Sequence, residues 1–328
     1  MASWVDLREP PESLLRLVSS DVRDDRYKAA CDLRIYANVA SIEALLFLLN
    51  DKDDHTRTSA ISSLDRILAF EDLKQFKPLV GPIIAEHFSI PEDRHRVVWT
   101  IDTYLDNPDI LERLLREVQI EVDRPDIGQY PYTFEKMLEA IGTLPKDDLE
   151  YAIRKLVTIG VFGPGFHPNV VSRALNFLFK HSRSHALMFA KLHLSGPTNG
   201  GFAISSYKSS RRTSWQNRSE IRKVSAEIVY LIGEKPENND KFSHDLLDAV
   251  IALIILTKKQ EPGIGLNYRQ EDKNKAEDVL WYILPRNPAI LSPKILGKFY
   301  KQLPQKMRER LESISPTTNT INTTIAKE

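Results

Sequence analysis

The chain has 328 residues, of which 42% are apolar and 27% are charged, a composition typical of a globular protein that buries a core. Its 45 basic and 45 acidic residues cancel, and its single cysteine, Cys31, excludes an internal disulfide and a cysteine-rich metal site. The longest apolar run, AVIALIIL at 249–256, is far shorter than the roughly 20 residues of a membrane span, so we expect a buried helix segment there and no membrane partner.

The N-terminal residues MASWVDLREP contain no apolar run behind a basic start, so no signal peptide is predicted. A chain with one cysteine fits a reducing compartment, and we expect a cytoplasmic location. Because Cys31 lies among Ala29, Ala30 and Leu33, we expect it to be a buried structural thiol.

Short amphipathic helices separated by short polar breaks dominate the chain. The apolar spacing predicts helices near residues 24–37, 41–51 and 53–68, and strand-like alternation is scarce. Pro78 and Pro82, in FKPLVGPIIAEHF, are expected to kink or split the helix that contains them. Further breaks are predicted at residues 121–133, 160–168, 234–241 and 259–267.

One pattern recurs along the chain: an arginine, then a small or apolar residue three positions later and an apolar residue four positions after that. It is carried by Arg26, Ala29 and Leu33, by Arg57, Ala60 and Leu64, by Arg94, Val97 and Ile101, and by Arg222, Ser225 and Val229. The small residue lets a paired helix approach closely, and the apolar residue fills the seam. One such helix pair cannot bury its own apolar face, so neighbouring pairs must stack.

With the preceding helix IEALLFLLND, this pattern resembles the HEAT-like repeats, including the short variety of roughly 30 residues. The resemblance is good over residues 22–70, weaker at 92–118 and 219–233, and only helical elsewhere, with 147–160 and 167–181 as degenerate units. It implies an all-α fold, an α-solenoid of stacked antiparallel helix pairs, with roughly 14 to 18 helices. It implies no single activity, because the family includes scaffolds, nucleic-acid binders and a few enzymes.

The predicted solenoid covers residues 1–314 and carries a polarised charge. Residues 1–150 hold 18 basic and 30 acidic residues, a net of −12, and residues 151–328 hold 27 and 15, a net of +12. Residues 195–218 are predicted to form a flexible basic loop, and 315–328 a disordered tail. No clear domain boundary is evident; if there is one, it lies near 121–133 or within 195–218.

The strongest departure from an ordinary composition is a stretch of 69 residues, 151–219, that contains no Asp or Glu. We assign the candidate anion-binding or partner-binding site to its cations and one of its aromatic residues: Arg154, Lys155, Arg173, Lys180, Arg183, Lys191, Lys208, Arg211, Arg212, Trp215 and Arg218.

Three readings of this basic segment stay open. Cations on successive helices could meet the phosphates of a nucleic acid, with Phe202, Tyr207 and Trp215 stacking on unpaired bases. They could instead contact an acidic protein surface, including the acidic half of a second copy of this chain. They could also be a solvated face without a ligand.

No residue set predicts a catalytic, metal or cofactor site. His181 and His185 have the spacing of two metal ligands on one helix, but Ser182–Ser184 between them suggest a turn, and no carboxylate lies near enough in sequence to complete a site. Acid pairs such as Asp53 and Asp54 fall where helices begin, where they cap. GPTNGG at 196–201 lacks the lysine of a phosphate-binding loop.

We therefore predict a non-enzymatic scaffold or adaptor that binds an acidic protein partner through its basic face and uses no cofactor. The alternative is a nucleic-acid-binding protein or a HEAT-like enzyme acting on nucleic acid. HEAT-like DNA glycosylases need a carboxylate beside aromatic residues, and here that carboxylate would have to come from outside residues 151–219. For the bilin lyases of the same family, no matching residue set is found.

Overall fold

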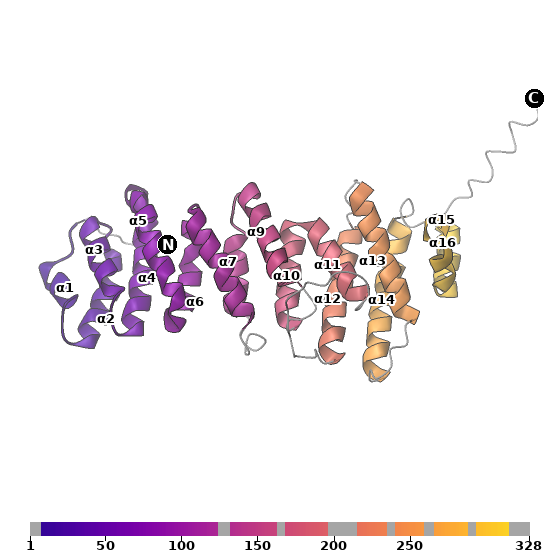
Figure 1. The fold of residues 1–328 in the computed structure, drawn as a ribbon, viewed down its shortest axis with the longest axis horizontal. Helices are drawn as coiled ribbons and strands as arrows, with labels where there is room; N and C mark the ends of the chain where they lie inside the picture. Colours follow the sequence, from indigo (N-terminus) through magenta and orange to yellow (C-terminus); the bar gives the residue numbers. More distant parts are fainter. Residues whose placement is uncertain are drawn as a thin grey trace, which may run out of the picture. The chain divides into compact units, whose positions relative to one another are not determined.

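The structure, a computed structural model, describes residues 8–123, 132–162, 168–195, 215–234, 240–258, 266–287 and 293–314. These residues form sixteen α-helices and five 3₁₀ helices, and no β-strand occurs among them (Figure 1). The predicted all-α class is confirmed. The contacts divide the chain into two compact units, unit 1 (Met1–Ile159) and unit 2 (Gly160–Glu328), and each is described by itself.

Unit 1 is a stack of helix pairs in two layers. Helices α2, α4, α6 and α8 pack side by side in one layer, and α5, α7 and α9 follow one another in the other, while α1 packs on α2 and α3 on α4. The bounds are α1 (Glu12–Leu17), α2 (Arg23–Asp32), α3 (Val39–Leu48), α4 (Asp54–Leu68), α5 (Lys77–Glu86), α6 (Pro91–Thr100), α7 (Pro108–Val122), α8 (Tyr132–Ile141) and α9 (Lys146–Ile159). Short 3₁₀ helices extend or join them: η1 (Leu33–Ile35), η2 (Glu71–Phe76), η3 (His87–Ser89) and η4 (Ile101–Tyr104).

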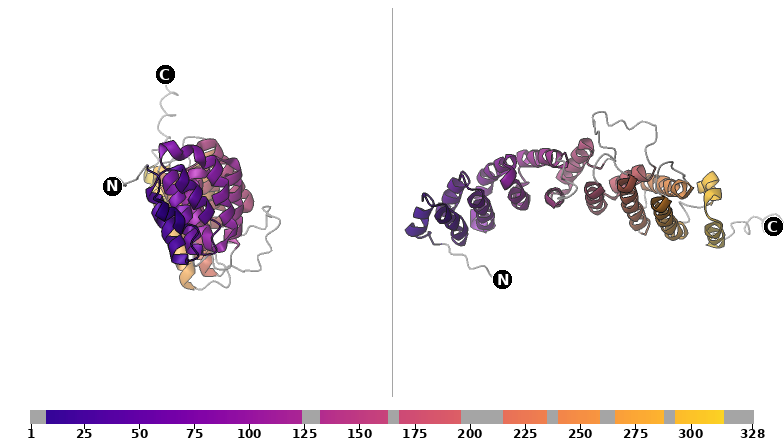
Figure 2. Two further views of the ribbon diagram at one scale, coloured as in Figure 1. Left: turned by 90° about the vertical axis from the view of Figure 1, so that its left-hand side faces the viewer. Right: turned by 90° about the horizontal axis from the view of Figure 1, so that it is seen from below.

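Unit 2 repeats the arrangement with longer helices. One layer contains α10, α12, α14 and α16, the other contains α11, α13 and η5, and consecutive helices pack across the layers. In the right-hand view of Figure 2 the helices are seen nearly end-on. The bounds are α10 (Pro168–His181), α11 (Arg183–Ser195), α12 (Trp215–Glu234), α13 (Asp240–Lys258), α14 (Leu266–Arg286), α15 (Pro293–Leu296), η5 (Gly297–Gln302) and α16 (Gln305–Ile314).

The small and apolar positions of the recurring pattern form the seam between neighbouring helices. Every one of them is fully buried in both units: Ala29, Leu33, Ala60, Leu64, Val97, Ile101, Ser225 and Val229. The apolar run at 249–256 lies inside α13 and is buried except for Ile255 and the half-buried Ile251. The pattern was therefore a correct guide to the core of each stack, because residues at this spacing occupy one side of a helix.

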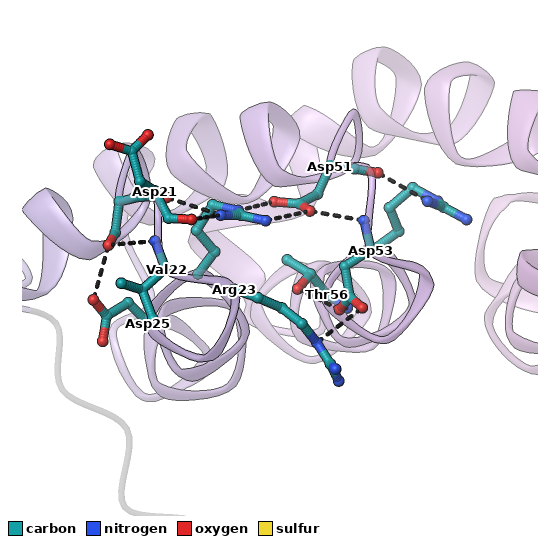
Figure 3. A network of polar contacts seen from close by, with 10 residues as sticks. Asp21, Val22, Arg23, Asp25, Asp51, Asp53 and Thr56 are labelled. Carbon is teal, nitrogen blue, oxygen red and sulfur yellow. Dashed lines mark hydrogen bonds and ion pairs between the residues drawn. The ribbon is translucent and has the colours of Figure 1, made fainter.

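The arginine of the pattern connects one repeat to the next. Arg26 bonds Asp51, in the turn that precedes α4, with its Nε 2.5 Å from Oδ2, and Arg57 bonds Asp93 of α6 at 2.8 Å. Arg26, Arg57 and Arg94 each also donate to the backbone carbonyl six residues earlier, in the turn before their own helix. Figure 3 shows the surroundings of Asp51, whose carboxylate accepts from Arg26 and whose backbone carbonyl accepts from Arg57. Arg26 and Arg57 thus fix the entry of their own helices and the position of the next repeat, whereas Arg94 pairs with Glu117 of α7.

The expectation for Cys31 was wrong, and of the two effects expected of Pro78 and Pro82, a kink or a split, the split does not occur. Cys31 is half-buried rather than buried, because it lies at the margin of the seam that Ala30 and Leu33 fill. Helix α5 is not split: Pro78 lies in its first turn, where a backbone N–H needs no partner, and Pro82, inside the helix, removes only one hydrogen bond.

The continuity of one solenoid over residues 1–314 stays a prediction, since the two units are described separately. The loop predicted at 195–218 is partly helical, because Ser195 ends α11 and residues 215–218 begin α12. The rest of it, residues 196–214, lies outside the described part. The predicted tail, residues 315–328, lies outside it as well.

Candidate partner-binding site

Helix α9 of unit 1 carries the first two residues of the candidate site. Arg154 is exposed and lies 3.5 Å from Glu150, one turn earlier on the same helix. Lys155 lies 3.6 Å from Glu112 of α7 and 5.2 Å from the centre of the Tyr151 ring. The Tyr151 hydroxyl donates to the same Glu112 carboxylate, and contact with Tyr151 and then with Glu112 raises the pKa of Lys155. A carboxylate from outside the acid-free segment therefore faces its first cations.

Helix α10 of unit 2 presents a solvent-facing stripe without a carboxylate. Asn169, Arg173, Asn176 and Lys180 follow one another at intervals that put them on one side of the helix. Three of them are exposed, and Arg173 is half-buried and bonded. Lys180 is exposed and forms no ion pair with a described residue, and its charge adds to burial in lowering the pKa of the neighbouring His181.

Helix α11 carries two candidate cations that are already engaged. The Arg183 guanidinium lies 5.9 Å from the centre of the Phe179 ring. Lys191 is 2.9 Å from Asp248 and 3.6 Å from Asp245, both on α13. No acid lies near Lys191 in the sequence, but two carboxylates of the adjacent helix lie near it in the folded structure.

The remaining candidates cannot be located as side chains. Lys208, Arg211 and Arg212 lie outside the described residues. Trp215 and Arg218 lie in the first turn of α12, and their side chains are outside the description. The structure thus brings together neither the full set nor its aromatic members, and the basic site as a whole stays a prediction.

The paired histidines do not share a helix. His181 ends α10 and His185 belongs to α11, where its Nδ1 lies 2.7 Å from Ser182 Oγ. The predicted turn between them is confirmed. His193 is buried, and its Nε2 lies 2.8 Å from the Phe162 carbonyl, to which it donates. Among the described residues, no three His, Cys, Asp or Glu side chains are grouped as metal ligands would be.

A shallow groove between α12 and α14 is lined by charges of both signs. Lys223 pairs with Glu271, and Lys275 with Glu227, each pair joining the two helices. Farther along the same helices, the Tyr230 and Tyr282 rings lie 4.2 Å apart, and Arg286 lies 3.5 Å above the Tyr282 ring. The paired charges join α12 to α14, and Asp278 leaves the groove with one negative charge in excess.

The sequence interpretation missed a second cationic region at the end of unit 2. Residues 279–308 contain no Asp or Glu and include Arg286, Lys294, Lys298, Lys301, Lys306 and Arg308. The signal was available in the sequence, but this acid-free stretch is shorter than the one at 151–219. The four lysines are exposed in α15, η5 and α16.

Within the parts of the chain that the structure covers, no helix has the length and apolar character required to cross a bilayer.

No known family model matches the chain, and no curated protein matches it. Among solved structures, the complex of CpcE and CpcF of phycocyanin lyase from Nostoc sp. is 16% identical, with 83% of this chain and 96% of that chain covered and a TM-score of 0.38. An engineered protein is also 16% identical, with 92% and 95% covered and a TM-score of 0.21. Similarity this low carries no argument about function.

Proposed function

We propose that the protein is a HEAT-like scaffold or adaptor without enzymatic activity, and that it binds an acidic protein partner through the basic segment at the start of unit 2. The observation that supports it most directly is the exposed Lys180 of α10, which forms no ion pair with a described residue and lies on a side of that helix whose other residues are not acidic. Helix α12 packs beside α10, and its first turn, with the residues before it, adds further cations to the same segment of sequence.

The physical basis is charge complementarity at a surface built from successive helices. A helix-repeat stack presents one side of each helix in a row, so it offers an extended partner several weak contacts at once. Lys180 and Arg173 lie on the same side of one helix. An excess of positive charge on a surface raises the rate at which an acidic partner associates. Lys155 and Lys191 have neighbouring carboxylates, so they contribute less to this attraction.

The alternative, a nucleic-acid-binding protein or a DNA-glycosylase-like enzyme, is favoured by one observation. Glu112 lies beside Tyr151 and Lys155, which places a carboxylate from outside the basic segment next to an aromatic ring and a cation. A glycosylase-type site would need that combination of groups. Its other members would have to come from residues that the described part does not place there.

The two proposals differ in which polyanion binds more tightly. The full-length chain is titrated with a fluorescent Glu-rich peptide and with single- and double-stranded DNA and RNA of matched charge, at two salt concentrations. We expect the peptide to bind at low salt and to be weakened by salt and by Lys180→Glu. The matched control is Lys28→Glu, which reverses an exposed lysine of unit 1 that has no ion pair with a described residue.

Each other outcome counts against the proposal. Tighter binding of an oligonucleotide, with steep salt dependence and loss on substitution of Lys208, Arg211 and Arg212 by Ala, would establish the nucleic-acid reading. Equal effects of Lys180→Glu and Lys28→Glu would show that α10 is not the docking surface. No binding of any polyanion at low salt would refute both readings.

A further inference from the structure

The last helix pair of unit 2 ends in a surface that we call the lysine cap: Lys294, Lys298, Lys301 and Lys306. Leu296, Leu303, Met307 and Leu311 are buried, where η5 packs on α13 and α16 packs on α14. The four lysines of the cap are exposed. None of them forms an ion pair with any residue that the structure describes.

The lysine cap differs from the other lysine-bearing surfaces of unit 2. Lys191, Lys223 and Lys275 each pair with a carboxylate of a neighbouring helix, which offsets their charge. A polar outer face is expected of any terminal repeat, because it keeps the stack soluble, but that role is met by charges of either sign. Here cations are in excess: residues 279–308 contain no acid, and the acids that follow in α16 are the exposed Glu309 and Glu312, of which Glu312 accepts from Tyr300 of η5.

Unit 1 carries a surface of the opposite sign, which we call the aspartate edge: Asp72, Asp102, Asp106, Asp109, Asp147 and Asp148. All six are exposed, and none forms an ion pair with a described residue. They lie in, or in the first helical turn after, three successive connections, from α4 to α5, from α6 to α7 and from α8 to α9.

These three connections lie along one edge of unit 1. Helices α4, α6 and α8 occupy one layer of a stack of antiparallel pairs, so their C-terminal ends point the same way. Direct contacts join the first two connections: Thr103 donates to Asp65 of α4 at 3.2 Å, and the Lys77 ammonium approaches the Thr103 carbonyl at 3.5 Å. Helix α8 packs against η4, which brings the third connection beside the second.

Helix capping explains only part of the aspartate edge. Asp109, Asp147 and Asp148 lie in the first turns of α7 and α9, where a negative charge favours the helix dipole. Asp72, Asp102 and Asp106 lie outside α-helices. Lys77 and Lys146 begin α5 and α9 in the same connections, so the edge carries an excess of negative charge and not negative charge alone. That excess, spread over three repeats, is larger than the helix starts require.

We propose that the protein associates with itself, the lysine cap of one molecule docking on the aspartate edge of a second copy. A second copy is the partner that the charges favour, because it supplies the complementary surface at the same concentration. The chain is neutral as a whole, with a net of −12 in residues 1–150 and +12 in 151–328, so copies do not repel one another. Contact between two different surfaces of identical chains is heterologous and produces open chains or closed rings.

This association does not rest on the proposed docking of an acidic partner at α10. It uses no cation of residues 151–219. Since each exposed ion pair contributes little and is screened by salt, the contact requires several pairs and weakens strongly with ionic strength.

Charge reversal on full-length protein tests the proposal. Sedimentation velocity at about 50 mM and about 500 mM NaCl compares the wild type with a cap variant, Lys298→Glu with Lys301→Glu, and an edge variant, Asp102→Lys with Asp106→Lys. We expect wild-type association at low salt that depends on protein concentration and is weakened on the order of tenfold or more at high salt. Each variant alone should stay monomeric, whereas a mixture of the two should associate, because it restores opposite charges across the contact.

The control variant, Lys28→Glu with Lys52→Glu, makes the same change in net charge as the cap variant, at exposed lysines of unit 1, and should associate as the wild type does. Circular dichroism confirms that each variant is folded. A wild type that is monomeric at low salt and high concentration would overturn the proposal, as would a mixture that fails to associate. If the cap variant instead loses oligonucleotide binding while the wild type never self-associates, the lysine cap is a nucleic-acid surface and a second copy is not its partner. Lys180→Glu should leave self-association intact, which separates this result from the α10 test.

Discussion

His193 shows how burial sets the protonation state of one side chain. It lies in the core of unit 2, donates from Nε2 to the Phe162 carbonyl, and burial lowers its pKa to about 4. The neutral imidazole is therefore the form that the folded unit holds. The hydrogen bond to the Phe162 carbonyl raises the pKa of His193, but burial lowers it by more.

A pH dependence of stability follows. Because the folded-state pKa of His193 lies below the unfolded value of 6.5, the unfolded chain binds more protons between these two pH values. The stabilisation is fully present above pH 6.5 and is lost as the pH falls toward about 4, by up to about 3 kcal/mol. Urea unfolding of wild type and His193→Gln across this range should show the difference in slope. If the free energies of unfolding of the two proteins change with pH in parallel, His193 does not take up a proton on unfolding.

At the scale of the element, the arginine ladder, formed by Arg26 with Asp51 and by Arg57 with Asp93, joins each repeat to the next. Asp93 is fully buried and contacts both Arg57 and His87, with His87 Nδ1 2.8 Å from Asp93 Oδ2. The sequence identified Arg57 and its spacing, but not Asp93 as its partner, which lies in the following repeat. Pairing between repeats depends on how helices stack, and the spacing within one helix does not contain that information.

Replacement of Arg57 by Met should destabilise unit 1 by about 3–5 kcal/mol, because it leaves the buried Asp93 without its main counter-charge. Combining it with Asp93→Leu should recover part of the loss, since no unpaired charge then remains buried. Urea titrations followed by circular dichroism measure both variants. The matched control is Arg16→Met, whose partner Glu12 is exposed on the same helix and whose loss should cost at most about 0.5 kcal/mol. Equal costs at Arg57 and Arg16 would show that the ladder does not contribute to stability.

The difference between spacing within one helix and contacts between helices also explains how far the candidate site could be predicted. A stretch without acids was read directly from residues 151–219, and Lys180 does lack an ion pair with any described residue. Lys155 and Lys191 do not, because Glu112 and Asp248 approach from other helices. One-dimensional charge patterning predicts the surface only where the neighbouring helices are also acid-free. The short lysine-bearing helices at the end of unit 2 carry an excess of cations, although Glu309 and Glu312 of α16 are exposed among them.

At the scale of the whole molecule, the division into two units predicts separate cores with separate stabilities. Leu64 in α4 and Leu253 in α13 are both fully buried, one in each unit. In a repeat stack, stability is a sum of local terms, so opening free energies can differ between regions of one chain. Replacing Leu253 by Ala should remove about 2–5 kcal/mol, the usual cost of a cavity in a packed core.

Native-state hydrogen exchange on the full chain locates that loss. With Leu253→Ala, protection should fall in peptides from α13 and α14 while peptides from α4 and α6 keep their wild-type protection, and Leu64→Ala should give the reverse pattern. If either substitution lowers protection equally in both units, the chain opens as one cooperative structure. Because exchange reports each helix separately, the pair of variants decides whether a partner bound at one unit could stabilise the other, which is the condition for communication along a scaffold of this kind.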